Sequence, residues 1–554
     1  MKEGSMLNML KRSIIPVVAM LLSILFILLG VFVHPALYWP LIATLPVVAL
    51  GAYDRYQRKW NITRNYPVAA RIRWMFYDLR PFLRAYIVED DMNGTPFSFE
   101  ARNLVHARAQ GRTDTQPFGT QRHTEELSYH WFAHSIKPEE KSEESPRLTV
   151  GSDQASKPYS ASVLNISAMS FGALSAHAVQ ALNLGAKLGH FYHDTGEGGL
   201  SKYHLSHGGD LVWELGSGYF GARDKHGNFD PGQFADMAAR DEVRMTEIKL
   251  SQGAKPGHGG MLLAAKVTEE IARARGVPAH EDCLSPSAHS AFATPVEMME
   301  FAARMRELSG GKPVGIKLCV GQMHEPFALM KAILETGITP DFIVVDGGEG
   351  GTGAAPLELS DWVGMPLDEG LNVMRNALVG CGLKDQIRLA ASGKVYSGMG
   401  LAQDLAKGAD WCNAARAFMF SIGCIQARRC HTGTCPTGVT TQDPRRQRGL
   451  VPEVQGPRAA RFHDETLKAL AYIVSAVGLK HPRELRPHHL IHRVSPEEMR
   501  PLDEIKTYLP KGSLLDAPED TLYAPWWRAA RADSFQPATN LDVERARKQR
   551  EPVN

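Results

Sequence analysis

Residues 342–353 read Phe-Ile-Val-Val-Asp-Gly-Gly-Glu-Gly-Gly-Thr-Gly. The run begins with aromatic and β-branched residues, which favour a buried strand, and ends in glycines, which allow a backbone turn close to a ligand. A segment with helical apolar spacing follows at 369–381. The sequence therefore predicts a strand, a glycine-rich turn and a helix, a unit whose strands pair in parallel through right-handed crossovers.

The same unit recurs on both sides of this stretch. Further strands are expected at 163–167, 190–194, 247–251, 314–318, 387–391 and 411–415, and further helices at 173–188, 266–275, 326–335 and 400–407. About eight such units fit an α/β fold of the (β/α)8 TIM-barrel type. An open, doubly wound parallel sheet is the structural alternative.

Composition narrows the functional classes. Apolar residues make up 44% and charged residues 22%, which is typical of a globular protein with a large core. The net charge of +2 implies no broad surface for nucleic acid. The cysteine count of 7 is odd and the cysteines are scattered, which favours a reducing compartment over a disulfide framework.

Two apolar runs stand near the start of the chain. Residues 14–33 carry no charge and are long enough to cross a bilayer as a helix, and a second run covers 36–53 after the break at His34-Pro35. Lys11 and Arg12 precede the first run, and basic residues follow the second. The positive-inside rule then predicts a two-helix, multi-pass anchor in the cell inner membrane with a cytoplasmic catalytic domain. A secretory signal peptide is the alternative.

Four parts are expected along the chain. Residues 1–60 form the two-helix transmembrane anchor, and 61–159 form an accessory region that ends in a polar linker at 137–159. Residues 160–445 form the barrel with its cysteine loop. Residues 446–554 form a C-terminal extension, whose charged end at 542–554 is expected to fray.

Unusual residues collect after the expected strands, where a barrel has its active face. The candidates for cofactor contacts are Ala168, Met169, Ser170, Asp346, Gly348, Gly351, Ser392, Gly393, Lys394, Asn413, Ala414 and Arg416. Glycine-rich turns after the last two strands are where barrels commonly hold a phosphate. The pattern therefore predicts a phosphorylated cofactor.

Two stretches match the G-x-G-x-x-G pattern of dinucleotide sites. Gly216–Gly221 is expected to have no strand before it and no helix after it, and Gly348–Gly353 runs into Pro356 without a long helix. The fingerprint needs strand, turn and helix together, so no dinucleotide site is predicted at either place.

Three cysteines stand close together near the end of the expected barrel. Cys424, Cys430 and Cys435 have the spacing C-x5-C-x4-C, with glycines and a proline that suit a loop wrapped around a compact object. Three ligands are too few for an ordinary four-cysteine cluster. The spacing favours a three-iron cluster, or a cluster with a ligand from elsewhere; three unrelated thiols near a helix end are the alternative.

Together these motifs resemble the FMN-binding synthase domain of glutamate synthase. The resemblance rests on 166–175 (Ile-Ser-Ala-Met-Ser-Phe-Gly-Ala-Leu-Ser), 194–199, 247–260, 350–356 and the cysteine loop, and it covers roughly residues 160–445. Stand-alone FMN-binding members of that family are the most similar in length. The resemblance implies a TIM barrel with FMN and a 3Fe–4S cluster held by Cys424, Cys430 and Cys435. It also implies reductive amination of 2-oxoglutarate, through 2-iminoglutarate, to L-glutamate.

The resemblance also implies roles for individual residues. Lys317 is expected to reach the flavin or a substrate carboxylate, with Lys249 and Lys255 as further cations. Gln252 is expected to hydrogen-bond the flavin ring, and Glu197 is expected to line the ammonia path or assist a proton transfer. Lys394 and Arg416 are the phosphate candidates.

This sequence departs from the family pattern, and these departures leave other functions open. No cysteine precedes Cys283, so a glutaminase nucleophile is not expected, and ammonia or another amine must come from solution or a partner. An external electron donor, such as a ferredoxin or a reductase subunit, is also expected. The alternatives are an FMN-dependent synthase of an N-substituted glutamate and a non-catalytic membrane redox sensor.

Overall fold

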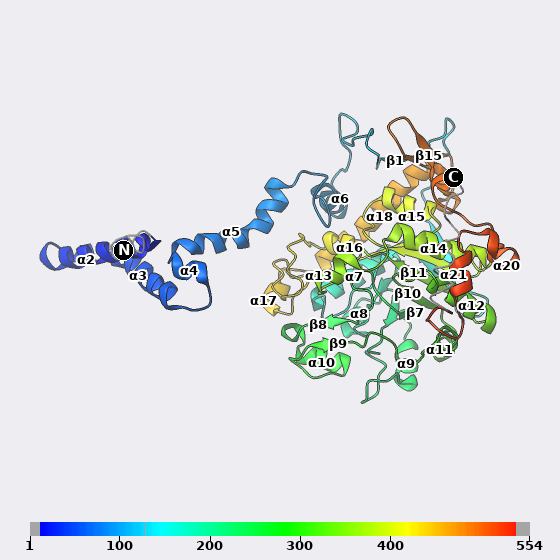
Figure 1. Cartoon of the computed structure of the whole chain (residues 1–554), viewed down its shortest axis with the longest axis horizontal. Helices are drawn as coiled ribbons and strands as arrows, with labels where there is room; N and C mark the ends of the chain where they lie inside the picture. The colour runs from blue at the N-terminus through cyan, green and yellow to red at the C-terminus, as the bar shows by residue number, and fades with distance from the viewer. Residues whose placement is uncertain (1–11, 128, 539–554) are drawn as a thin grey trace. The chain divides into compact units, whose positions relative to one another are not determined.

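The computed structural model describes residues 12–127 and 129–538 and forms two compact units, Met1–Phe99 and Glu100–Asn554 (Figure 1). Lys11, which we used to orient the membrane helices, lies outside the described residues. The charged end at 542–554, which we expected to fray, lies outside them too.

The first unit is built on a helical hairpin. Helices α2 (Ile14–Phe32) and α3 (Leu41–Tyr56) are joined by the short helix η1 (Pro35–Tyr38), so the chain turns near the predicted break. The Ser23 hydroxyl donates to the Thr44 hydroxyl at 2.7 Å and ties the two helices together. The segments Ile14–Phe32 and Pro35–Tyr56, the second of which includes η1 and α3, are both long and apolar enough to cross a membrane. Helices α4 (Asn61–Asn65) and α5 (Ala69–Leu83) and the π-helical turn η2 (Arg84–Val88) complete the unit.

The second unit contains a closed barrel of parallel strands, which confirms the predicted TIM-barrel fold. In chain order the strands are β4 (Leu164–Ile166), β5 (His193–Asp194), β6 (Leu211–Leu215), β7 (Val243–Lys249), β10 (Val314–Leu318), β11 (Phe342–Asp346), β12 (Arg388–Ser392) and β13 (Trp411–Ala414). Each pairs with its neighbour along the chain, and β13 pairs with β4 to close the ring. The open-sheet alternative is therefore wrong.

One of the barrel strands was missing from the sequence prediction. Strand β6 stands directly before Gly216, so the expectation that no strand precedes Gly216–Gly221 is wrong. The stretch after it forms turns, and the next helix, α9, begins only at Pro231. The loop at 251–260 consequently follows the fourth barrel strand, rather than the third that the sequence had indicated.

Helices surround the barrel (Figure 1). They are α7 (Ala176–Gly189), α8 (Lys202–Leu205), α9 (Pro231–Ala238), α10 (Glu269–Arg275), α11 (Pro295–Leu308), α12 (Glu325–Thr336), α13 (Leu357–Trp362), α14 (Leu367–Gly380), α15 (Gly398–Ala406) and α16 (Arg416–Ser421). Several begin at side-chain caps, as at Ser175, Asp230 and Thr294, whose oxygens accept backbone N–H groups. Polar caps thus fix where many crossover helices start.

The C-terminal part packs against the barrel. The long helix α18 (Pro452–Val477) lies on α7 so closely that a Cβ on Gly185 would stand 2.7 Å from the Ala459 Cβ. Strand β14 (Leu490–Arg493) pairs with β1 (His130–Phe132) of the accessory region and with β15 (Met499–Pro501). The tail continues through α19 (Leu502–Ile505) and α20 (Ser513–Asp516) to α21 (Ala524–Ala529). The accessory region and the extension therefore share one sheet.

A buried ion pair joins several elements at the amino-terminal end of the barrel. Asp341, directly before β11, accepts from Arg306 of α11 at 3.0 Å and from the Val314 backbone at 2.7 Å. Its other oxygen accepts from the Ser152 hydroxyl at 2.7 Å. Ser152 follows β2 (Arg147–Val150), which pairs with β3 (Tyr159–Ser162) inside the stretch where a polar linker was expected.

Replacing this carboxylate should weaken the fold. We expect Asp341→Asn to lower the free energy of unfolding by about 3–5 kcal/mol, because Arg306 would keep a buried charge without its partner. Asp385, whose pair with Lys511 is exposed, provides the matched control, and Asp385→Asn should cost less than about 1 kcal/mol. Urea unfolding followed by tryptophan fluorescence measures both. Equal losses in the two variants would contradict the assignment.

Candidate active site

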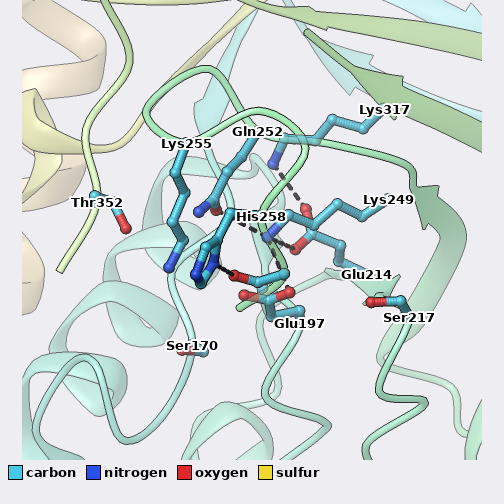
Figure 2. A network of polar contacts seen from close by, with 12 residues as sticks. Ser170, Glu197, Glu214, Ser217, Lys249, Gln252, Lys255, His258, Lys317 and Thr352 are labelled. Carbon is cyan, nitrogen blue, oxygen red and sulfur yellow. Dashed lines mark hydrogen bonds and ion pairs between the residues drawn. The ribbon is translucent and has the colours of Figure 1, made fainter. Parts of the chain in front are cut away.

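Ionisable side chains gather where the barrel strands end. Figure 2 shows Lys317, Lys249, Glu214 and Glu197 converging, with Gln252 beside them. Lys249 contacts Glu197 and Gln252. Glu214 links Lys249 to Lys317. The predicted residues Lys317, Glu197 and Gln252 thus belong to one network. The sequence prediction missed Glu214, because the strand that carries it was not recognised.

Lys317 is held by a short buried ion pair. Its Nζ lies 2.7 Å from Glu214 Oε2, and the side chains are only 4% and 1% exposed. Lys249 Nζ lies 3.1 Å from Glu197 Oε2 and 3.8 Å from Glu214 Oε1, and it donates to Gln252 Oε1 at 2.9 Å. Each ammonium group therefore has a fixed position in the barrel mouth.

Strand register sets like charges side by side. Glu214 of β6 is the register partner of Glu247 of β7, and Lys249 of β7 is the partner of Lys317 of β10. Like-charged pairs opposite each other destabilise a sheet when they stand alone. Here the glutamate pair lies next to the lysine pair, and the two pairs neutralise each other.

Three carboxyl groups crowd below the lysines. The carboxylate oxygens of Asp194, Glu214 and Glu247 lie within 4.8 Å of one another, and all three residues are buried. Burial raises the pKa of Asp194, and the Glu214 carboxylate raises it further. Burial and the charge of Asp194 likewise raise the pKa of Glu247. Protons are therefore retained in this cluster near neutral pH.

The same carboxylates keep Lys317 charged. Burial alone would lower its pKa, but Glu214, Asp194 and Glu247 outweigh that effect and raise the pKa well above its ordinary value. Lys317 is therefore a permanent cation, suited to hold an anionic group rather than to exchange a proton.

Glu197 lies in a pocket bounded by glycines. A Cβ on Gly260 would collide with its carboxylate, and a Cβ on Gly216 would stand 2.9 Å from the Glu197 Cβ. Burial raises the pKa of Glu197, but the charge and hydrogen bond of Lys249 lower it more, so the net pKa is below the ordinary value. Glu197 is therefore ionised near neutral pH and carries a negative charge beside Lys249.

The loop after β7 carries three more polar side chains. Gln252, Lys255 and His258 all extend from it in Figure 2. Lys255 is buried, and its Nζ donates to the Ala354 carbonyl at 3.0 Å. Burial lowers the pKa of Lys255 to about 8. His258 was not among the predicted site residues, although it stands in the same glycine-rich turn.

The turn after β11 is braced by polar contacts. Asp346 Oδ2 accepts from the Gly253 backbone at 2.7 Å, so the loops after β7 and β11 are joined. A Cβ on Gly253 would collide with the Gly347 carbonyl, so only glycine fits there. The predicted residues Gly348 and Gly351 belong to the same turn, and a Cβ on Gly351 would stand 2.8 Å from Arg416 Cδ.

Two cations lie close together after the last two strands. Arg416 begins α16 and donates to the Glu349 carbonyl at 2.8 Å. Burial lowers the pKa of Arg416 to about 10. The pKa of Lys394 is lowered by burial and then by the charge of Arg416. Arg416 is half-buried and Lys394 is exposed. Like charges in this arrangement favour a bound anion, so this corner fits a phosphate group, together with Ser392 and Gly393 of the preceding turn.

Other predicted contacts have different environments. Met169 is buried, whereas Ala168 and Ser170 are half-buried, and Ser170 Oγ accepts from Arg275 at 3.4 Å. Asn413 is buried, and its Oδ1 accepts from the Tyr192 hydroxyl at 2.6 Å and from the Trp411 indole at 3.1 Å. The Asn413 side chain is thus bonded inside the barrel, and Ala414 offers only backbone.

The cysteine loop follows α16. Cys424 and Cys430 are half-buried and Cys435 is buried. Burial and, to a lesser degree, negative charge on Cys430 and Cys435 raise the pKa of the Cys424 thiol to about 12, so the three sulfurs influence one another. Lys266 Nζ donates to the Cys430 carbonyl at 3.3 Å, which places a cation behind the loop.

Hydrogen bonds to sulfur fit a thiolate-bound cluster. The Gln426 backbone N–H donates to Cys424 Sγ at 3.5 Å, and the Thr437 hydroxyl lies 3.5 Å from Cys435 Sγ. Burial raises the pKa of Cys435, but bonds from Thr437 and Thr440 bring it below the ordinary value. Soft sulfur ligands of this kind are the ones that iron–sulfur clusters use, and Cys435 is the one whose thiolate these contacts stabilise.

Comparison with known proteins finds matches to one family. Residues 99–480 match the conserved region in glutamate synthase. The glutamate synthase large subunit-like protein YerD of Bacillus subtilis (strain 168) is 34% identical over 496 residues, which cover 82% of this chain and 94% of that protein. The archaeal-type glutamate synthase (NADPH) of Thermotoga sp. (strain RQ2) is 31% identical over 327 residues, and the match covers 59% of this chain and 61% of that protein.

Among solved structures, the flavin-binding domain of baker's yeast flavocytochrome b2 is similar with a TM-score of 0.38 at 12% identity. That match covers 75% of this chain and 82% of that domain, and a likeness of this degree carries no argument about function. The sequence match over 99–480 and the near-complete coverage of the Bacillus subtilis protein are sufficient on their own. The chain belongs to the glutamate synthase family.

Proposed function

We propose that this chain is a glutamate synthase-like oxidoreductase that converts 2-oxoglutarate and ammonia, through 2-iminoglutarate, into L-glutamate. Family membership supports the reaction class. The observation that carries the proposal is the buried network of Lys317, Lys249, Glu214, Glu197 and Gln252 at the carboxyl ends of the strands. Such a network offers fixed cations to a dianionic keto acid and ionised or protonated carboxyl groups to its amination.

Bound FMN supplies hydride chemistry, and a 3Fe–4S cluster on Cys424, Cys430 and Cys435 supplies a route for electrons. Lys394 and Arg416, with Ser392 and Gly393, hold the phosphate. The remaining cofactor contacts in the proposal are Ala168, Met169, Ser170, Gln252, Lys317, Asp346, Gly348, Gly351, Asn413 and Ala414.

Different side chains of the protein have different roles toward the substrate. Lys317 and Lys255 hold the carboxylates of 2-oxoglutarate, because both are buried cations near neutral pH. Ionised Glu197 attracts ammonium by its charge and lines the path along which ammonia reaches the keto carbon. Asp194 and Glu247, whose pKa values are raised, retain a proton that reduction of the imine requires.

Two features of the proposal concern the surroundings of the chain. Helices α2 and α3 anchor it in the cell inner membrane, with the barrel in the cytoplasm; their length and apolar character support this. Ammonia, or another amine, arrives from solution or from a partner, and an external donor such as a ferredoxin or a reductase subunit supplies electrons.

An anaerobic assay of the detergent-solubilised protein, loaded with FMN and iron, tests the reaction. With 2-oxoglutarate, ammonium and a reduced low-potential dye, glutamate should form. Lys317→Met should lower the rate about 10²–10³-fold, because a preorganised cation at the reacting substrate is lost. Lys331→Met, which removes a lysine that bonds only the Ala530 carbonyl and stacks on Trp527, should leave the rate unchanged.

Two outcomes would contradict this proposal. Loaded protein that makes no glutamate would exclude the reaction, and it would favour a redox sensor. Faster turnover with methylamine than with ammonia would indicate an N-substituted glutamate as the product.

Substrate binding should depend on pH through Lys255. Its ammonium group is charged below its pKa of about 8 and loses that charge as the pH rises, so the KM for 2-oxoglutarate should increase above about pH 8. Lys255→Arg keeps a cation at every accessible pH and should remove this increase. Steady-state assays from pH 6.5 to 9.5 compare the two proteins. Superimposable pH profiles would show that Lys255 does not hold the substrate.

Iron binding should depend on the cysteine loop alone. We expect Cys430→Ser to lower the iron content and to abolish turnover with a protein electron donor, because hydroxyl oxygen is a poor ligand for soft iron. FMN content should stay the same. Cys381→Ser, at a buried cysteine after α14, is the control and should keep its iron. Iron retained in Cys430→Ser would exclude this residue as a ligand.

A further inference from the structure

Exposed arginines border the cysteine loop. Residues 424–450 contain only one acidic residue, Asp443, and five exposed arginines: Arg428, Arg429, Arg445, Arg446 and Arg448. Five positive charges less one negative charge leave +4 on this segment, whereas the whole chain carries only +2. Positive charge is therefore concentrated here, and we call these five residues the arginine patch.

The two halves of the patch are joined through the end of the cysteine loop. Arg428 and Arg429 belong to the cysteine loop, whereas the others lie on or beside α17 (Pro444–Gln447). Arg446 Nη1 donates to the Thr434 carbonyl at 3.4 Å, next to Cys435. A Cβ on Gly438 would stand 2.6 Å from the Arg446 carbonyl, so α17 packs directly on the end of the loop.

Most of these charges are uncompensated. Arg446 Nε lies 3.6 Å from Asp443 Oδ2 in a pair that is about two-fifths exposed on each side. The side chains of Arg428, Arg429, Arg445 and Arg448 make no hydrogen bond or ion pair within residues 12–127 and 129–538. Four unpaired guanidinium groups on one surface attract and orient an acidic partner over several ångströms.

The patch lies where an electron donor must approach. The cysteine loop reaches the surface at Arg428, Arg429 and His431, while its sulfurs stand half-buried or buried just behind. The loop is tightly curled, with positive φ at Gln426 and Arg428, so its fold presents both arginines outward rather than leaving them on a flexible arm. A protein bound to the patch would therefore be separated from the three sulfurs only by this loop.

Resting on the function proposed above, we propose that the arginine patch is the docking surface for an acidic, low-potential, one-electron carrier protein. Each carrier is oxidised by one electron as it docks and leaves. Two docking events supply the two electrons that, with two protons from water, convert one imine into one amine. Charge complementarity favours a carrier whose own redox centre is ringed by Asp and Glu.

Charge reversal on α17 tests the assignment without touching the cysteines. With a reduced plant-type ferredoxin as donor, Arg445→Glu/Arg448→Glu should lower kcat/KM for the donor about 10–100-fold, mainly through KM. The wild-type rate with this donor should fall as salt is added. With reduced methyl viologen, a small cationic dye, the double variant should keep its rate within about twofold.

The matched control reverses two exposed charges at the opposite end of the barrel. Lys187→Glu/Arg240→Glu should change neither rate, since both residues lie near the amino-terminal ends of strands β5 and β7. An unchanged ferredoxin rate in Arg445→Glu/Arg448→Glu would overturn the proposal. Loss of binding to phosphatidylglycerol vesicles with an unchanged ferredoxin rate would overturn it in favour of a lipid contact. Failure of the dye-driven reaction in wild-type protein would refute the proposed function instead.

Discussion

The ion pair between Lys317 and Glu214 constrains the whole carboxyl-terminal face of the barrel. Its partners belong to β10 and β6, which are separated by β7, so the pair forms only when three strands are in register. Two buried charges are stable only when each keeps its partner, and losing one costs about 3–5 kcal/mol. A slip of any of these strands by one residue would turn its charged side chain out of the barrel. The register of these strands therefore determines which charged side chains meet in the site.

The positions of the glycines at the strand ends follow from these ion pairs. Glu197 must reach Lys249 from a different loop, and the space it needs is open only because Gly260 and Gly216 have no side chains. Gly253 plays the same part where its backbone bonds Asp346 and joins two loops. These glycines at the strand ends are thus required by the close approach of backbone to charged groups.

The barrel could be predicted because its signals are local. Runs such as 342–346 and 314–318, each followed by a glycine turn, mark strands without knowledge of their partners. Strand β6 was missed because its sequence, Leu-Val-Trp-Glu-Leu, contains a charge that marks an exposed segment until a buried partner is known. That partner, Lys317, stands about a hundred residues away, so the pair is a property of the closed ring and not of either segment. The sequence therefore predicted which types of residue form the site. Which of their charges pair with one another became visible only in the folded barrel.

The closure of the barrel also fixes the position of the cysteine loop. Strand β13 pairs with β4, and Ser167 donates its backbone N–H to the Ala414 carbonyl, so the first and last units of the barrel meet at this seam. The Arg416 side chain extends from this seam and donates to the Glu349 carbonyl. The chain then continues through α16 to Cys424. Lys266, from the loop region after β7, reaches both the Ala173 carbonyl beyond β4 and the Cys430 carbonyl. The loop is therefore fixed to three units of the barrel.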